Sequence, residues 1–205
     1  MILLVDKTKR YIQMQNYNNP SILNEEKIIN IKSEVLFREA EDEFYYFYNL
    51  SKAQKKLKEA IDLTPNHIKS IMLYANVCYV KGQIKKALNL YKKSEELNNK
   101  DSRILASIAN CYKSLENYTE ALTYTDKALA LLKLENNHLY SQLIEIKIDS
   151  LVNLKKYKEA YITFIQAQNI LDIISLKAIY NSNYELINEK IKLQNRLKRS
   201  NLKIV

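Results

Sequence analysis

The amino-acid sequence predicts an all-α fold, a solenoid of about four helix pairs with a C-terminal capping helix. The 205-residue chain has one glycine and two prolines, too few for tight hairpin turns or phosphate-binding loops. Apolar and small residues recur at helical spacing, and longer segments of similar sequence recur along the chain at a constant interval. Helices joined by short polar turns are therefore expected along most of the chain.

The composition is that of a globular protein able to bury one continuous core, with 47% apolar and 27% charged residues. No stretch approaches the roughly 18 uninterrupted apolar residues of a membrane-spanning helix. The opening MILLVDKTKR becomes charged too early for a signal peptide. We therefore expect a cytoplasmic protein with no membrane span.

Charge and cysteine content give little support for a nucleic-acid or metal site. The net charge is +9, but the lysine excess accompanies many Asn, Ile and Tyr residues, a bias typical of AT-rich codons. Cys78 and Cys111 have neither CxxC spacing nor a nearby histidine, so we expect two buried free thiols. No metal ion and no cofactor are predicted.

Internal repeats emerge when three segments are aligned: SKAQKKLKEAIDL from 51, KKALNLYKKSEEL from 85 and TEALTYTDKALAL from 119. Their alanines Ala53, Ala87 and Ala121 are evenly spaced, and we call this spacing the repeat length. A fourth segment, KEAYITFIQAQNI, places Ala160 five positions beyond the next repeat length, so five extra residues lie in or beside LKLENNHLY. Self-similarity at a fixed period predicts a repeat architecture.

Each repeat is predicted to contain two helices. Four residues after the alanine, on the same helical stripe, stand Leu57, Tyr91, Thr125 and Phe164. Nine residues before it, on the preceding helix, stand Phe44, Cys78, Tyr112 and Leu151. Small residues at a helix crossing let the two axes approach closely, while large residues of the partner helix fill the space around them.

These features resemble the tetratricopeptide repeat family, whose members repeat two helices at intervals of about 34 residues. The repeated alanines, together with Ala75 and Ala109 in the first helix of a pair and Pro65 after a second helix, carry the resemblance. The resemblance implies a right-handed solenoid over residues 34–170, with repeats at 34–67, 68–101, 102–140 and 141–170.

The ends of the chain and three positions depart from this pattern. Residues 1–33 are expected to form an N-terminal arm, in which a helix could start near residue 24 because Glu25 and Glu26 follow. Residues 171–205 are expected to form the C-terminal cap. Glu41, Thr125 and Lys147 replace the apolar or aromatic residues usual at their positions in the family.

One run of the sequence, EFYYFYN, holds five consecutive aromatic residues. At about 100° per residue, Phe44, Phe47 and Tyr48 fall on the apolar side of the first helix, which predicts that they belong to the core. Tyr45 and Tyr46 fall on the side that faces the concave groove in a tetratricopeptide stack.

The same side of the other first helices completes a predicted peptide-binding groove. Exposed tyrosines are typical interface anchors, and asparagine side chains can hold a ligand main chain by donating and accepting hydrogen bonds. The predicted groove residues are Arg38, Asp42, Tyr45, Tyr46, Lys69, Met72, Asn76, Tyr79, Arg103, Asn110 and Lys113. Alternatives remain, because asparagine is common here in the family with or without a known ligand, and a tyrosine could pack on a neighbouring helix.

The segment after residue 170 carries two stripes on different helix faces. Leu186, Leu193 and Leu197 form an apolar stripe, as expected of a helix that closes a solenoid. The second stripe is basic and consists of Lys192, Arg196, Arg199 and Lys203. A polar outer face of the cap explains it, and the alternative is a docking stripe for RNA or an anionic membrane surface.

The resemblance implies a binding protein and not an enzyme: a scaffold or adaptor that holds a peptide segment or helix of a partner protein. No Ser/His/Asp or Cys/His arrangement, carboxylate pair in a cleft or metal-ligand cluster is recognisable in the sequence. The alternative function is a subunit of a ribonucleoprotein or other large assembly, docking through the basic stripe. Catalysis is the third hypothesis, and the oligomeric state is not specified.

Overall fold

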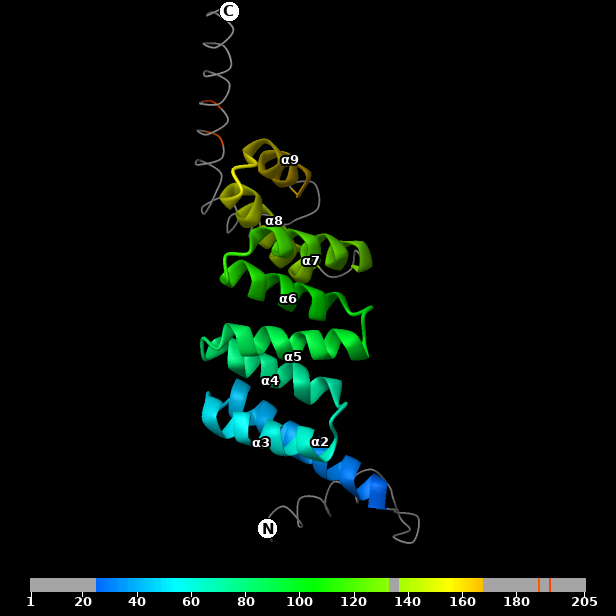
Figure 1. Cartoon of the computed structure of the whole chain (residues 1–205). Coiled ribbons are helices and arrows are strands. Elements are labelled where there is room, and N and C mark those ends of the chain that lie inside the picture. The colour runs from blue at the N-terminus through cyan, green and yellow to red at the C-terminus, as the bar shows by residue number, and fades with distance from the viewer. Residues whose placement is uncertain (1–24, 133–136, 168–187, 189–191, 193–205) are drawn as a thin grey trace, which may run out of the picture. The chain divides into compact units, whose positions relative to one another are not determined.

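The computed structural model describes residues 25–132, 137–167, 188 and 192, and this part of the chain is helical with no strand (Figure 1). The first helices of the four pairs are α2 (Glu25–Tyr45), α4 (Ile68–Val80), α6 (Ser102–Ser114) and α8 (Asn137–Asn153). The second helices are α3 (Leu50–Leu63), α5 (Ile84–Leu97), α7 (Tyr118–Leu131) and α9 (Tyr157–Ala167). The protein is an all-α helical repeat of the solenoid class, as the sequence predicts.

The helices divide into two compact units, Met1–Asn98 and Asn99–Val205. In unit 1, α2 packs on α3 and α4, and α4 packs on α5. In unit 2, α6 packs on α7 and α8, while α8 also packs on α7 and α9. Within a unit, helices adjacent in sequence are therefore neighbours in space, because each pair buries its apolar stripe against the next helix.

The repeated small residues lie in the core. Ala53, Ala87, Ala121 and Ala160 are all fully buried, each on the second helix of its pair. The residues four positions later are buried as well, including the polar Thr125, whose hydroxyl donates to the Ala121 carbonyl at 2.7 Å. The alanine spacing thus identifies the helix crossings correctly.

The five extra residues between the third and fourth repeats mostly lengthen a helix. Helices α4 and α6 have 13 residues each, whereas α8 has 17 and begins at Asn137. Helices α3, α5 and α7 start at residues 50, 84 and 118, and α9 starts at 157, five positions later than the repeat length predicts. The insertion therefore extends the first turn of α8 and leaves the register of α9 intact.

Left-handed residues recur in the turns between the two helices of each pair. Tyr48, Gly82, Glu116 and Lys155 have φ angles of 51°, 74°, 59° and 60°. After α4, the Gln83 amide donates to the Cys78 carbonyl and the Gly82 amide to the Tyr79 carbonyl, both at 2.9 Å. This is the Schellman arrangement that ends many helices on a residue with positive φ.

The turn after α2 corrects the prediction for the aromatic run. Helix α2 ends at Tyr45, and the hydrogen bonds that follow span more residues than those of an α-helix. The Phe47 amide donates to the Asp42 carbonyl at 3.1 Å, and the Asn49 amide donates to the Glu43 carbonyl at 2.7 Å. The side chain of Phe47 is 71% exposed and that of Tyr48 is 81% exposed, so placing both in the core was wrong.

Phe44 packs partly buried against the core cluster of unit 1, as predicted. The helical wheel misplaced Phe47 and Tyr48 because it continued the helical period past Tyr45, the last residue of α2. Tyr48 stands one repeat length before Gly82, and that spacing already marks it as the left-handed turn residue.

Both cysteines are buried and unpaired, as predicted, and burial raises the pKa of the Cys111 thiol to about 12. In the ranges the structure describes, none of the helices has the length and apolar character needed to cross a membrane.

Candidate functional site

The predicted groove residues of unit 1 lie on two helices that contact each other, α2 and α4. Arg38, Asp42 and Tyr45 on α2 are exposed, and so is Lys69 at the start of α4. The remaining three, on α4, are half-buried: Met72, Asn76 and Tyr79. These seven side chains form what we call the first-helix face of unit 1.

Tyr46 is displaced from this face. It follows the last residue of α2 and is 76% exposed, next to the exposed Phe47 and Tyr48. Tyr45, still helical, is 54% exposed and makes an edge-on contact with Phe44, whose ring centroid lies 4.8 Å away. Tyr45 thus stands at the edge of the face, and Tyr46 belongs to the turn.

Asn76 is oriented from within the core. The hydroxyl of Tyr91, a residue buried on α5, donates a hydrogen bond to Asn76 Oδ1. In the third repeat the residue corresponding to Tyr91 is Thr125, which bonds its own helix. Asn110 therefore lacks the tyrosine that fixes its counterpart, and the two asparagines are not equivalent.

In unit 2, both basic residues predicted for the groove have acidic partners. Arg103 Nε and Nη2 donate to the two carboxylate oxygens of Asp101 at 3.0 and 2.7 Å. This bidentate contact, helped by the backbone amides at the start of α6, lowers the pKa of Asp101. Lys113 Nζ lies 3.5 Å from Asp149 Oδ2, which joins α6 to α8. A carboxylate ligand would have to compete with these partners.

Glu41 is a half-buried carboxyl group that the groove prediction omitted. It occupies the position of the fully buried Ala75 and Ala109 in the next two repeats. Burial raises its pKa, and the neighbouring Arg38 and Lys69 partly oppose this effect. In the sequence, Glu41 is recognisable only as a departure from the repeat pattern. In the structure its carboxyl group interacts electrostatically with Arg38 and Lys69 of the first-helix face.

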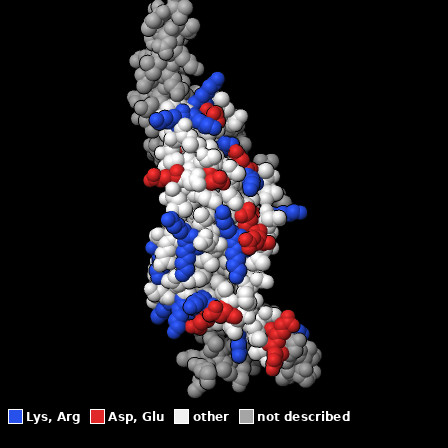
Figure 2. Space-filling view, viewed as in Figure 1, with Lys and Arg blue, Asp and Glu red and all other residues white. Residues whose placement is uncertain are grey.

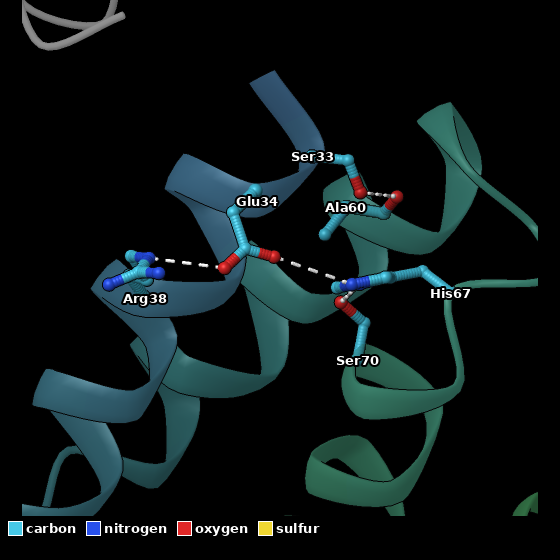
Figure 3. A network of polar contacts seen from close by, with 6 residues as sticks. All are labelled: Ser33, Glu34, Arg38, Ala60, His67 and Ser70. Carbon is cyan, nitrogen blue, oxygen red and sulfur yellow. Dashed lines mark hydrogen bonds and ion pairs between the residues drawn. The ribbon is translucent and has the colours of Figure 1, made fainter. Parts of the chain in front are cut away.

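A polar network joins α2 to the start of α4 (Figure 3). His67 Nδ1 lies 2.6 Å from Ser70 Oγ, and His67 Nε2 lies 3.4 Å from Glu34 Oε2. Arg38 Nε donates to the other oxygen of Glu34 at 3.1 Å. Nearby, the Ser33 hydroxyl donates to the Ala60 carbonyl at 2.9 Å, which ties α2 to α3.

Burial lowers the pKa of His67 and outweighs the opposing effect of Glu34, so the imidazole is neutral at pH 7. In the neutral tautomer that carries its proton on Nε2, the ring donates toward Glu34 and accepts at Nδ1 from the Ser70 hydroxyl. A serine, a histidine and a carboxylate thus meet, although sequence reasoning recognised no such set. His67 stands one repeat length before Asp101, the residue that caps α6, and this spacing marks it as a helix-start residue.

The network does not have the geometry of a nucleophilic site. Ser70 is fully buried and points along the first turn of its own helix, where no substrate carbonyl could approach. Its contacts fasten the start of α4 to α2. Among the residues described, no group of three or more histidine, cysteine or acidic side chains could hold a metal ion.

Little of the basic C-terminal stripe falls in the described part of the chain. Lys192 is helical and exposed, whereas Arg196, Arg199 and Lys203 lie outside the described residues. The RNA or membrane alternative therefore stays a prediction.

The chain resembles known repeat proteins. A model of the family described as "Anaphase-promoting complex, cyclosome, subunit 3" matches residues 48–128. A MamA structure from Desulfovibrio magneticus RS-1 matches with a TM-score of 0.62 and 15% identity, over 82% of this chain and 93% of that one. No curated protein sequence matches the chain.

Two further similar structures are described as tetratricopeptide proteins. YrrB, described as having an unusual peptide-binding site, matches with a TM-score of 0.56 and 18% identity, over 89% of this chain and 86% of that one. TTC0263 from Thermus thermophilus matches with a TM-score of 0.54 and 16% identity, over 85% and 86%. Together with the repeated helix pairs and the buried alanines, these similarities show that the chain has a helical repeat fold like that of tetratricopeptide proteins.

Proposed function

We propose that the protein is a non-enzymatic scaffold or adaptor whose first-helix face binds a peptide segment or helix of a partner protein. The observation that carries this proposal is the accessibility of Arg38, Asp42, Tyr45 and Lys69 on two packed helices. These side chains contribute little to the core, and they combine an aromatic anchor with charges of both signs. Such a set suits a polar, extended ligand with one or two large side chains.

The fixed Asn76 supports the same proposal. Its carbonyl oxygen is held by Tyr91, so its amide group can donate to a ligand main chain without first losing rotamer freedom. The similarity to YrrB, which is described as having a peptide-binding site, favours a peptide over a small molecule. Arg103 and Lys113 would take part only if a ligand released them from Asp101 and Asp149.

A peptide-display selection tests the proposal. Peptides selected on the wild-type protein would be titrated against Tyr45→Ala and Asn76→Ala, with Asn89→Ala, an exposed change on α5, as the matched control. We expect each first-helix variant to weaken binding by about tenfold or more while the control binds like the wild type. Equal affinity for all variants, with intact melting curves, would refute the first-helix face as the binding site.

A further inference from the structure

The outer surface of unit 2, formed by α7, α8 and α9, is hollowed and electrically balanced. A pocket of about 550 Å³ lies between these helices, and its lining includes Asp126, Lys147, Lys156 and Glu159. Lys147 Nζ lies 2.7 Å from Asp126 Oδ1, and Lys156 Nζ lies 3.9 Å from Glu159 Oε2. Each lysine of the pocket therefore has a carboxylate partner on the same surface.

The corresponding surface of unit 1, formed by α3, α4 and α5, is basic and not charge-balanced. Tyr74 occupies the position of Lys147, and its hydroxyl accepts a hydrogen bond from Lys86 Nζ at 2.8 Å. The two acidic positions of the pocket are both lysines here, since Lys58 replaces Asp126 and Lys86 replaces Glu159. Equivalent positions of the repeat therefore form a surface of balanced charge in unit 2 and a basic surface in unit 1.

Four lysines, Lys55, Lys58, Lys81 and Lys86, form what we call the outer lysine cluster. Lys81 Nζ donates to Gln54 Oε1 at 2.6 Å, and Gln54 Nε2 lies 3.9 Å from Cys78 Sγ. Both Lys81 and Lys86 oppose the burial that raises the pKa of the Cys78 thiol, so both ammonium groups lie near it.

Lys58 stands one helical turn after Gln54 on α3, and Lys55 stands three residues before Lys58, so both lysines extend the cluster along this helix. Both are exposed, and neither has an ion-pair partner within the described part of the chain. Glu59 and Asp62 bound the cluster toward the end of α3. Figure 2 shows basic side chains gathered over α3 and α5 on the face in view.

The cluster lies away from the first-helix face. Tyr74 and Cys78 on α4, and Lys81 directly after its last residue, fall about 180° around the helix axis from Met72 and Asn76. A ligand of one face would therefore leave the other free.

We propose that the outer lysine cluster is a docking site for an acidic segment of a partner protein. Charge complementarity selects the occupant, because four ammonium groups, two of which have no ion-pair partner among the described residues, attract a run of Asp or Glu side chains. The cluster is short and closed by Glu59 and Asp62, which suits a few carboxylates and would repel the continuing backbone of a nucleic acid. This inference goes beyond the proposed function and does not depend on it.

A short poly-glutamate peptide of only a few residues is the probe, titrated against the full chain by fluorescence anisotropy at low and at near-physiological salt. One variant changes the four lysines of the cluster to Gln. The control removes the same amount of charge from exposed positions of unit 2: Lys100, Lys127, Lys155 and Lys158, each to Gln. A single-stranded RNA and phosphatidylserine vesicles are tested in parallel, and thermal melts check that each variant is folded.

We expect the cluster variant to lose about tenfold or more in affinity for poly-glutamate, as four surface ion pairs of ordinary strength would contribute, and the control to lose less than about twofold. Equal losses in the two variants, or no binding by the wild type, would overturn the proposal. Dependence of RNA or vesicle binding on the cluster, with poly-glutamate binding unaffected, would overturn it in favour of that ligand. If the fourfold variant melts early, Lys55→Gln with Lys58→Gln, which removes no contact of the fold, must still weaken poly-glutamate binding.

Discussion

The hydrogen bond from Tyr91 to Asn76 links the core to the first-helix face, and a double-mutant cycle can measure it. Tyr91→Phe keeps the buried ring and removes only the hydroxyl, so no large cavity forms. A net hydrogen bond contributes about 0.5–1.5 kcal/mol to stability, and the half-buried Asn76 carbonyl would lose its donor. We expect Tyr91→Phe to lower the free energy of unfolding by about 1 kcal/mol.

Urea unfolding of the wild type, Tyr91→Phe, Asn76→Ala and the double variant gives the coupling energy directly. We expect a coupling of about 0.5–1.5 kcal/mol, with peptides selected on the wild type binding Tyr91→Phe more weakly because Asn76 is no longer held. Additive effects of the two single variants would show that the hydroxyl does not act through Asn76. The asparagine would then have no fixed orientation to offer a ligand.

Three other changes test the fold and its electrostatics. Ala87→Leu should overpack a fully buried helix crossing and cost about 1–3 kcal/mol, whereas Lys85→Leu on the exposed side of the same helix should cost little; equal melting temperatures would disprove the register. Gly82→Ala should cost about 1 kcal/mol from the positive φ alone, because an added Cβ would contact nothing within 4 Å, and chemical unfolding will measure this. Glu41→Gln should stabilise the protein at pH 7 and lose that advantage below pH 4.5. Since the pKa of Glu41 is raised in the folded state, the contribution of Glu41 to stability is largest below its ordinary pKa of 4.5 and is lost as the pH rises. A stability gain of the variant that persists in acid would contradict burial as the cause of the shift.

The sequence was sufficient to locate the helix pairs because their register is carried by buried residues. A buried alanine must stay small wherever two helices cross, so Ala53, Ala87 and Ala121 keep the period visible among variable surfaces. The insertion before α8 was located for the same reason, since the alanine of α9 resumes the pattern. The spacing of the alanines could not predict that the inserted residues lengthen α8, because it counts residues and does not specify their conformation.

The candidate site was harder to predict because it depends on pairing between side chains. A helical wheel places Arg103 and Lys113 on a common face, but it cannot show that Asp101 and Asp149 hold them. The bond from Tyr91 to Asn76 likewise joins residues 15 positions apart on different helices, and only the packing angle of those helices brings them together.

Positions that break the repeat are the best guide to what distinguishes this protein from other solenoids of its kind. The buried alanines are needed by any stack of such helices, so they specify the fold and carry no information about a partner. Thr125, by contrast, leaves Asn110 without the tyrosine that fixes Asn76, and Lys147 balances the charge of an outer pocket where Tyr74 supports a basic surface in unit 1. These exchanges alter side-chain pairing and leave the buried alanines in place, so they are the positions at which variants can test binding without changing the helix crossings.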